Sequence, residues 1–331
     1  MSETTTRTKR IVTIGGGTGH FALLSGLKEH DVDITAIVTM SDNGGSTGML
    51  RDELGVLPPG DLRQCLVALS EGDETMRALF THRFPRGSLK GHTFGNIFIS
   101  ALEQVSGSID RAVEEAGKIL KIRGTVLPIT LDKTELVTKL GNGKVLKGED
   151  ALAGYLLVSK FGVKDMGLRP EAALNPRARS AIREADLIII GPGNLYSSLL
   201  PNMLVRGLPQ ALKRAKAPKV FVANLMNKHG HTDGFTCARY VEEIERLATT
   251  RRSIDVVLYN TTPISPRLLK RYVDEGEPVL CAGREARGIT YVGADLLSET
   301  LHVPTRSDPL RRTLIRHDPN KLAAAIVAML R

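Results

Sequence analysis

A glycine cluster directly behind a short apolar run constrains the fold of this chain more than any other feature of its sequence. The apolar run 11–14 is followed by Gly15, Gly16, Gly17, Thr18 and Gly19. Residues 21–28 then carry apolar side chains at helical spacing, and residues 34–40 form a second, β-branched run. Strand, tight turn, helix and strand in this order make a βαβ unit, which requires parallel strands.

The same cluster has the chemistry of a phosphate site. Glycines allow a ligand to approach the backbone closely, and the unpaired N–H groups and dipole at the start of the next helix favour an anion. The dinucleotide fingerprint G-x-G-x-x-G is incomplete, because His20 stands where its third glycine belongs, and the Walker lysine pattern is missing. A tight strand-to-helix turn without a ligand is the alternative interpretation.

Polar side chains also follow the second apolar run, in the glycine-bearing loop 41–48. Asp42, Asn43 and Ser46 are the candidate ligand contacts in this loop. Both loops follow the carboxyl ends of their strands, where open α/β sheets bind ligands. We therefore expect the two loops to border one crevice.

Two later segments contribute polar residues to the same predicted crevice. Asp61 and Arg63 follow the Pro- and Gly-rich break 58–60, although Asp61 is also a good helix N-cap. His92 and Asn96 belong to a third glycine-bearing loop and could bond the sugar or phosphate of a ligand. A single loop histidine is more often structural, and that alternative stays open for His92.

The second half of the chain repeats the arrangement of strand and glycine turn. The strand-like run 186–190, which is apolar after Asp186, leads directly into a glycine turn, and the run 219–223 ends in a polar loop that continues to residue 234. The predicted ligand contacts in these loops are Gly191, Gly193, Asn194, Asn224, Thr232 and Asp233. The repetition predicts a crevice lined from both halves of the sheet.

The order of strands, glycine turns and helices predicts an α/β fold with a Rossmann-like, doubly wound, mostly parallel sheet. With 331 residues, of which 42% are apolar and only 4% aromatic, the chain can form one large domain with an aliphatic core. We expect a disordered tail over residues 1–8 and a single domain over residues 9–331. Alternating apolar and polar residues, together with the hairpin signal Asn142-Gly143, predict a small β-rich insertion at about 125–165.

The composition restricts the class of partner and the compartment. A formal net charge of +9 suits an anionic small molecule as well as a nucleic acid. No aromatic-plus-basic RNA-binding module is recognisable, so nucleic acid is not expected as the main partner. Cys65, Cys237 and Cys281 are far apart and predict neither a metal site nor a disulfide framework. A reducing cytoplasm is the expected location, since neither a signal peptide nor a membrane-spanning run is present.

Several motifs together resemble a known family. They are the segments 14–19, 41–48, 51–53, 57–63, 91–96, 191–196, 224–226 and 232–236. Their combination resembles the YvcK (GlmR) group of gluconeogenesis factors, which belongs to the superfamily of 2-phospho-L-lactate transferase (CofD-like). The resemblance extends from about Lys9 to the C-terminus. This chain departs from the family pattern at His231, where the family usually has an acidic residue. His229 and His231 beside Asp233 suggest a metal cluster, but no further ligand set is in sight, so no metal is predicted there.

The resemblance implies a sensor without catalytic residues that binds UDP-N-acetylglucosamine. It also implies control of carbon flow into cell-wall precursors and of cell shape on gluconeogenic carbon sources. The partners it suggests are an amino-sugar biosynthesis enzyme such as glucosamine-6-phosphate synthase, and further copies of this chain in a homo-oligomer. A basic cluster in the tail could help to hold the diphosphate: Arg306, Arg311, Arg312 and Arg316.

Two enzymatic functions remain as alternatives. The superfamily resemblance implies a transferase that moves a phospholactyl-type group from a nucleotide diphosphate to a deazaflavin with Mg²⁺, for which Asp42 would be the metal ligand. The superfamily commonly has two adjacent acids there, whereas Asn43 follows Asp42 in this chain. An NAD-dependent dehydrogenase would place Asp42 on the ribose, but the third glycine and a recognisable proton donor are missing. NAD as an additional ligand stays open.

Overall fold

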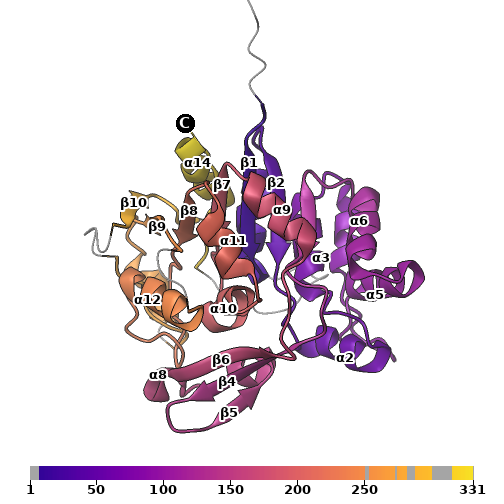
Figure 1. The fold of residues 1–331 in the computed structure, drawn as a ribbon, viewed down its shortest axis with the longest axis horizontal. Coiled ribbons are helices and arrows are strands. Elements are labelled where there is room, and N and C mark those ends of the chain that lie inside the picture. The colour runs from indigo at the N-terminus through magenta and orange to yellow at the C-terminus, as the bar shows by residue number, and fades with distance from the viewer. Residues whose placement is uncertain (1–6, 250–252, 273, 282–287, 300–314, 331) are drawn as a thin grey trace, which may run out of the picture.

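A seven-stranded parallel sheet forms the centre of the computed structural model, which describes residues 7–249, 253–272, 274–281, 288–299 and 315–330. Its strands, in spatial order, are β10 (Thr290–Ala294), β9 (Val256–Asn260), β8 (Lys219–Val222), β7 (Leu187–Ile190), β1 (Arg10–Gly15), β2 (Asp33–Val38) and β3 (Thr125–Pro128). Helices flank this sheet (Figure 1). Every residue of strands β7 and β8 is buried, as the continuous aliphatic run of β7 requires.

The strand order reverses between β1 and β7. From β1 the chain runs outward to β2 and β3, and from β7 it runs outward in the opposite direction to β8, β9 and β10. Ile14 pairs with Ile37 of β2 and with Ile190 of β7, so the glycine turns after β1 and β7 lie next to each other. This order confirms the predicted doubly wound α/β fold and marks the switch point where such sheets bind ligands.

The helices connect the strands and pack against one another. Their bounds are α1 (Gly17–Leu27), α2 (Gly45–Leu54), α3 (Gly60–Leu69), α4 (Glu74–Thr81), α5 (Phe94–Ser106), α6 (Ile109–Leu120), α7 (Glu149–Ala153), α8 (Val158–Phe161), α9 (Pro176–Glu184), the π-helix η1 (Leu195–Leu199), α10 (Leu200–Met203), α11 (Leu208–Arg214), α12 (Cys237–Leu247), α13 (Pro266–Tyr272), α14 (Pro319–Val327) and the 3₁₀-helix η2 (Ala328–Leu330). The N-terminal helix α1 packs against α14. A Cβ atom on Gly26 would collide with the Pro319 carbonyl, so this approach requires glycine.

A separate three-stranded antiparallel sheet lies below the central sheet in Figure 1. Its strand order is β5 (Val145–Lys147), β4 (Glu135–Leu140) and β6 (Val163–Arg169). The predicted hairpin is confirmed between β4 and β5, where Gly143 has a φ of +87°. The predicted start of the insertion at residue 125 is wrong, because β3 pairs with β2 in the central sheet. A four-residue strand at a sheet edge is too short for its periodicity to reveal its partner.

One disulfide is present, although the cysteine spacing predicted no disulfide framework. Cys237 and Cys281 form a disulfide with a Cα–Cα separation of 5.1 Å, whereas Cys65 is free and buried. The paired residues are 44 positions apart in the sequence. Backbone pairing between Thr236 and Leu280 brings them together, and cysteine spacing gives no signal for such a contact.

The ends of the chain bear on two further predictions. Of the predicted tail, residues 1–6 lie outside the described residues, while the Arg7 guanidinium bonds the Asp186 carboxylate at 2.7 Å. The predicted basic residues Arg306, Arg311 and Arg312 also lie outside the described residues. Across the described ranges, no helix combines the length and apolar character needed to cross a membrane.

Candidate functional site

A cavity of about 820 Å³ opens at the switch point of the sheet. One wall comes from the turns after β1 and β7, another from residues 224–229 after β8, and a third from residues around Tyr272 and Arg316. The predicted ligand-binding residues that line this cavity are Thr18, Gly19, Gly193, Asn194, Asn224 and Thr232. The structure thus brings both halves of the chain to one cavity.

A carboxylate from α3 supports the turn after β1. Gly17 donates its N–H to Asp61 Oδ1 at 3.1 Å, and a Cβ atom on Gly16 would collide with Asp61 Oδ2. Gly17 has a φ of +69°, a conformation that side chains rarely adopt. The Gly17 N–H, which was expected to face a phosphate, therefore bonds the Asp61 carboxylate instead. Thr18 and Gly19 lie on the cavity wall.

His20, which replaces the third glycine of the dinucleotide fingerprint, is a core residue. It is fully buried, and its Nε2 lies 2.8 Å from Thr13 Oγ1. A Cβ atom on Gly15 would lie 3.3 Å from its ring. Burial lowers the pKa of His20 to about 3, so the imidazole is neutral near pH 7 and supports the end of β1.

Asn224 fastens the turn after β7 to the loop after β8. Its Nδ2 donates to the Gly193 carbonyl at 3.0 Å, and its Oδ1 accepts from the Gly193 N–H at 3.4 Å. Gly191, at the start of this turn, has a φ of +80°. A Cβ atom on Gly19 would lie 2.7 Å from the Pro192 carbonyl oxygen. The two predicted glycine turns are therefore in direct contact.

Three carboxyl groups, those of Asp42, Asp61 and Glu149, interact next to the first glycine turn. Burial raises the pKa of each, and the charge of Asp42 raises the pKa of Asp61 and of Glu149 further. Asp42 accepts hydrogen bonds from the Glu149 carboxyl and, at 3.0 Å, from the Gly44 N–H. Glu149 is the first residue of α7 in the insertion, so reasoning from strand ends missed it.

Two predicted ligand residues instead connect the insertion to the central domain. Asn43 Oδ1 accepts the Asp150 N–H at 2.9 Å. Asp233 accepts hydrogen bonds from Ser159 Oγ at 2.6 Å and from the Gly230 N–H at 2.7 Å. Burial alone would raise the pKa of Asp233, but the hydrogen bonds that it accepts outweigh burial and hold the pKa below its ordinary value. Neither residue lines the cavity.

A buried hydrogen-bond network collects four other predicted residues, Ser46, Arg63, His92 and Asn96. His92 Nδ1 lies 3.1 Å from Ser46 Oγ, and Asn96 Nδ2 donates to the same oxygen at 3.2 Å. Arg63 Nε donates to Asn96 Oδ1 at 2.9 Å. These four residues bond one another, and none of them is among the residues that line the cavity.

Two cationic side chains face the cavity. Lys228, which sequence reasoning missed, donates from Nζ to the Ala153 carbonyl at 3.2 Å. Burial lowers its pKa, and the charge of Glu149 partly compensates. Arg316, predicted as part of the basic tail cluster, also lines the cavity. No local sequence motif predicts a role for Lys228, because the conformation of the loop after β8 is what places it at the cavity.

The histidines after β8 do not assemble a metal site. His229 Nδ1 pairs with Asp233 Oδ1 at 3.0 Å, while His231 is buried elsewhere in the loop. Burial, and then the charge of Lys228, lower the pKa of His231 to about 4. Within the part of the chain that the structure describes, no group of three or more His, Cys, Asp or Glu side chains is arranged to hold a metal ion.

Known proteins resemble this chain over nearly its whole length. The family model of 2-phospho-L-lactate transferase CofD matches residues 11–297. The gluconeogenesis factor of Bacillus subtilis is 38% identical over 325 residues, covering 97% of this chain and 98% of that protein. An Aquifex aeolicus protein whose name carries the same term is 41% identical over 330 residues, covering 97% and 96%. A solved UPF0052-family structure from Bacillus halodurans has a TM-score of 0.88 at 36% identity, covering 97% of this chain and 99% of that one.

Proposed function

The chain belongs to the CofD family and, within it, to the gluconeogenesis factors, and we propose that it is a regulatory protein that binds UDP-N-acetylglucosamine. The observation that carries this proposal is the cavity at the switch point, where two glycine turns face a wall that contains cations. Its volume of about 820 Å³ suits a small-molecule ligand, since such sites span roughly 300–1,000 Å³.

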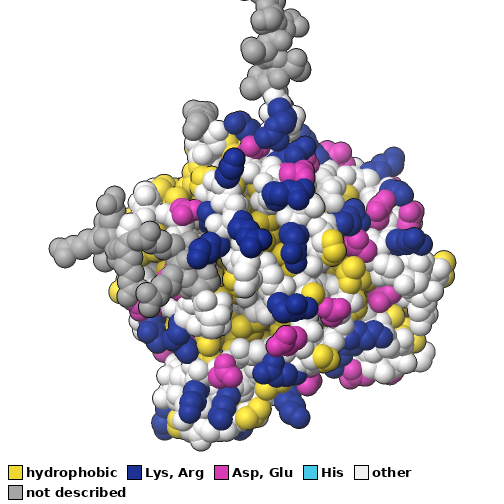
Figure 2. All heavy atoms as spheres, viewed as in Figure 1, with side chains coloured by type: hydrophobic (Ala, Val, Ile, Leu, Met, Phe, Trp, Pro, Cys, Tyr) yellow, Lys and Arg dark blue, Asp and Glu magenta, His cyan; other side chains and the backbone are white. Residues whose placement is uncertain are grey.

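The diphosphate of the ligand would bind beside Thr18 and Gly19. These residues belong to the first turn of α1, where backbone N–H groups and the helix dipole favour negative charge. That turn contains no acidic residue. Lys228 and Arg316, which also line the cavity, would neutralise the phosphates. Basic side chains are spread over much of the face in Figure 2, and the net charge of +9 attracts such an anion.

The remaining walls suit the uracil and the sugar. Tyr240 and Tyr272 are both at the cavity wall; Tyr240 is fully buried within it, and Tyr272 would contact the base or the acetamido group. The amide of Asn194 and the hydroxyl of Thr18 would serve sugar hydroxyls. Burial raises the pKa of both tyrosines to about 12, so their hydroxyls stay protonated at every physiological pH.

The cellular part of the proposal follows from family membership. In the cytoplasm, the protein would report the level of the nucleotide sugar and adjust carbon flow into cell-wall precursors, and thereby cell shape, on gluconeogenic carbon sources. It would act as a homo-oligomer on an amino-sugar biosynthesis enzyme such as glucosamine-6-phosphate synthase. The basis is the match to gluconeogenesis factors.

One observation favours a second candidate function, a Mg²⁺-dependent transferase of a phospholactyl-type group. Glu149 adds a carboxyl group to Asp42 and Asp61 beside the glycine turn, where the sequence alone offered Asp42. Carboxylate oxygens are ligands that Mg²⁺ accepts. If Mg²⁺ binds there, Asp42 would be its ligand and the metal would neutralise charge on the diphosphate.

Calorimetric titration separates these functions. The purified protein is titrated with UDP-N-acetylglucosamine, GDP and NAD, each with and without Mg²⁺. We expect binding of the UDP-sugar that does not depend on the metal, without turnover of the ligand. Binding of GDP only with Mg²⁺ would contradict the sensor and lead to assays with deazaflavin acceptors. Binding of NAD alone would contradict both.

A further inference from the structure

The segment 274–281 begins at the cavity wall and is held by backbone hydrogen bonds to the loop after β8. Val279 N–H donates to the Leu225 carbonyl at 3.1 Å, and His229 N–H donates to the Glu275 carbonyl at 2.9 Å. Asp274 and Glu275 line the cavity together with this loop. The position of the segment therefore affects the shape of the cavity.

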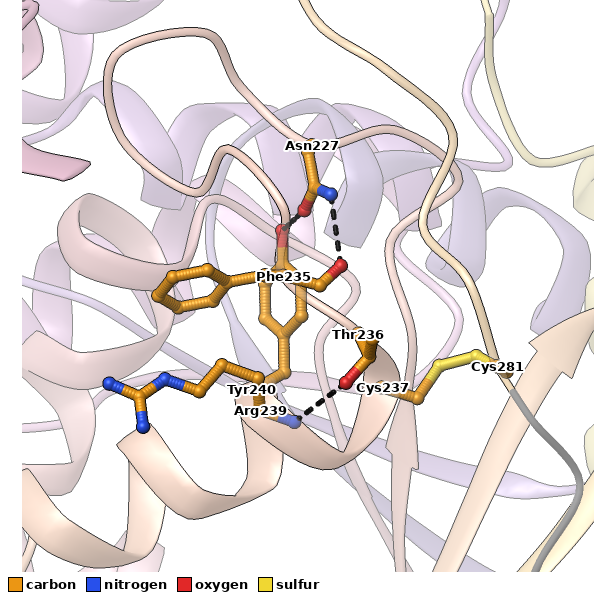
Figure 3. Close-up of a disulfide and its surroundings, with 7 residues drawn as sticks. All are labelled: Asn227, Phe235, Thr236, Cys237, Arg239, Tyr240 and Cys281. Atoms are coloured by element: carbon orange, nitrogen blue, oxygen red, sulfur yellow. Dashed lines mark hydrogen bonds between the residues drawn. A yellow bond between two sulfur atoms is a disulfide. The ribbon is translucent and has the colours of Figure 1, made fainter. Parts of the chain in front are cut away.

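The disulfide fixes the far end of this segment to α12. Cys281 is its last residue, and Cys237 is the first residue of the 11-residue helix. Cys237 N–H also donates to the Leu280 carbonyl at 3.0 Å. Figure 3 shows the bond joining the segment to the helix start. The disulfide and this backbone hydrogen bond thus attach the end of the segment to the same residue, Cys237.

One helical turn beyond the disulfide, α12 holds the cavity loop directly. Tyr240 lies three positions after Cys237, and its hydroxyl donates to Asn227 Oδ1 at 3.0 Å. The same hydroxyl lies 3.1 Å from Thr232 Oγ1. Asn227 Nδ2 in turn donates to the Phe235 carbonyl at 2.9 Å (Figure 3). Tyr240, Asn227 and Thr232 all line the cavity, so the disulfide joins two elements of its wall.

We propose that Cys237 and Cys281 form a thiol–disulfide exchange site, at which dithiol reductants open the bond and loosen this wall of the cavity. Cys281 is partly exposed, whereas Cys237 is almost completely buried. A reductant thiolate therefore attacks the Cys281 sulfur, and Cys237 leaves as a thiolate at the N-terminal end of α12, where the helix dipole stabilises it.

The second thiol of the reductant completes the reaction. As a thiolate it attacks the sulfur of the reductant in the mixed disulfide, so that the reductant becomes a cyclic disulfide and Cys281 is released. The two protons of the dithiol pass to the Cys237 and Cys281 thiolates. Two electrons move from the reductant to the protein, and a disulfide oxidant reverses the reaction.

The test compares oxidised and reduced full-length protein, with dithiothreitol as the reductant and its oxidised form as the oxidant. Thiol alkylation followed by mass spectrometry counts free cysteines, and amide hydrogen exchange follows residues 225–234 and 274–281. We expect reduction to speed exchange in both segments about tenfold and to weaken UDP-N-acetylglucosamine binding by a similar factor. The effect on affinity rests on the proposed function, whereas the effect on hydrogen exchange does not.

Matched variants locate the response. Cys237→Ser and Cys281→Ser should exchange like the reduced protein in both conditions, while Cys65→Ala should respond to the reductant like the wild type. Three free thiols after oxidation, or equal exchange in both states, would overturn the proposal. A response that survives Cys237→Ser would also overturn it. Absence of UDP-sugar binding in both states would count against the proposed function only, because hydrogen exchange would still decide the role of the disulfide.

Discussion

The carboxyl group of Glu149 donates a hydrogen bond to the carboxylate of Asp42, joining the insertion to the loop after β2. Two carboxyl groups can share such a bond only while one of them carries a proton. Burial, with the charges of Asp42 and Asp61, raises the pKa of Glu149 to about 9. Glu149 is therefore the proton carrier near pH 7, and contact between the insertion and the central domain depends on pH.

The first prediction concerns this pH dependence. Because the folded protein keeps a proton on Glu149 that the unfolded chain releases near pH 4.5, the free energy of unfolding falls as pH rises from there to about 9. In Glu149→Gln the amide replaces the protonated carboxyl, so the loss between pH 5 and pH 9 should shrink by at least about 1 kcal/mol. Urea denaturation at several pH values measures the free energy of unfolding of each protein. Glu53→Gln, at an exposed position, is the control. Equal slopes for Glu149→Gln and the wild type would refute the assignment of the proton.

The second prediction concerns the bridge between the turns after β7 and β8. Asn224→Ala removes both hydrogen bonds to the Gly193 peptide and should lower the free energy of unfolding by about 1–3 kcal/mol. It should also weaken nucleotide-sugar binding, because the Gly193 turn is part of the cavity wall. Thermal and chemical denaturation measure the first effect, and calorimetry measures the second. Exposed Asn320→Ala is the control, and a stability equal to that of the control would argue against the bridge.

The third prediction concerns the charge of Lys228. Lys228→Met keeps most of the apolar chain but removes the cation from the cavity. Affinity for UDP-N-acetylglucosamine should fall about 10- to 100-fold, as expected for a hydrogen bond to a charged group. The exposed Lys216→Met removes the same charge away from the cavity and should bind like the wild type. If both variants lose the same affinity, the effect is one of overall charge, and the contact with Lys228 is disproved.

The fourth prediction concerns the contact of α1 with α14. In Gly26→Ala the new methyl group meets the Pro319 carbonyl and should lower the free energy of unfolding by about 1–3 kcal/mol through overpacking. In Gly154→Ala the corresponding atom would lie 3.5 Å from the Asp150 carbonyl oxygen, so this control should be tolerated better. Denaturation curves of both proteins make the comparison, and a larger loss for Gly154→Ala would contradict it.

Local sequence patterns predicted the parts of the fold that are local. The apolar runs that form β1 and β7 lead directly into glycine turns. Each strand and its turn are consecutive in the sequence, so a local pattern is enough to predict them. Parallel pairing at a switch point then follows from general rules of α/β sheets. The edge strand β3 was assigned to the insertion because its four residues resemble the alternating segment that follows.

Contacts over long sequence distances could not be predicted in the same way. Glu149 reaches Asp42 from the insertion, and Cys281 reaches Cys237 through the pairing of two loops. Asn43 and Asp233 had the residue types of ligand contacts, but each of them bonds a residue of the insertion. A polar residue at a strand end can use the same side-chain atoms to bond a ligand or a neighbouring loop. Only the tertiary structure shows which of the two it bonds.

The packing of α14 on α1 also sets an order of events during synthesis. The helix that follows the first strand cannot cover its apolar side until Pro319–Val327 has left the ribosome. Until then, Gly26 of α1 lacks its native neighbours Pro319 and Ala323. The face of α1 that α14 covers is therefore the last part of this helix to be buried, and such late-covered apolar surface favours association between incomplete chains.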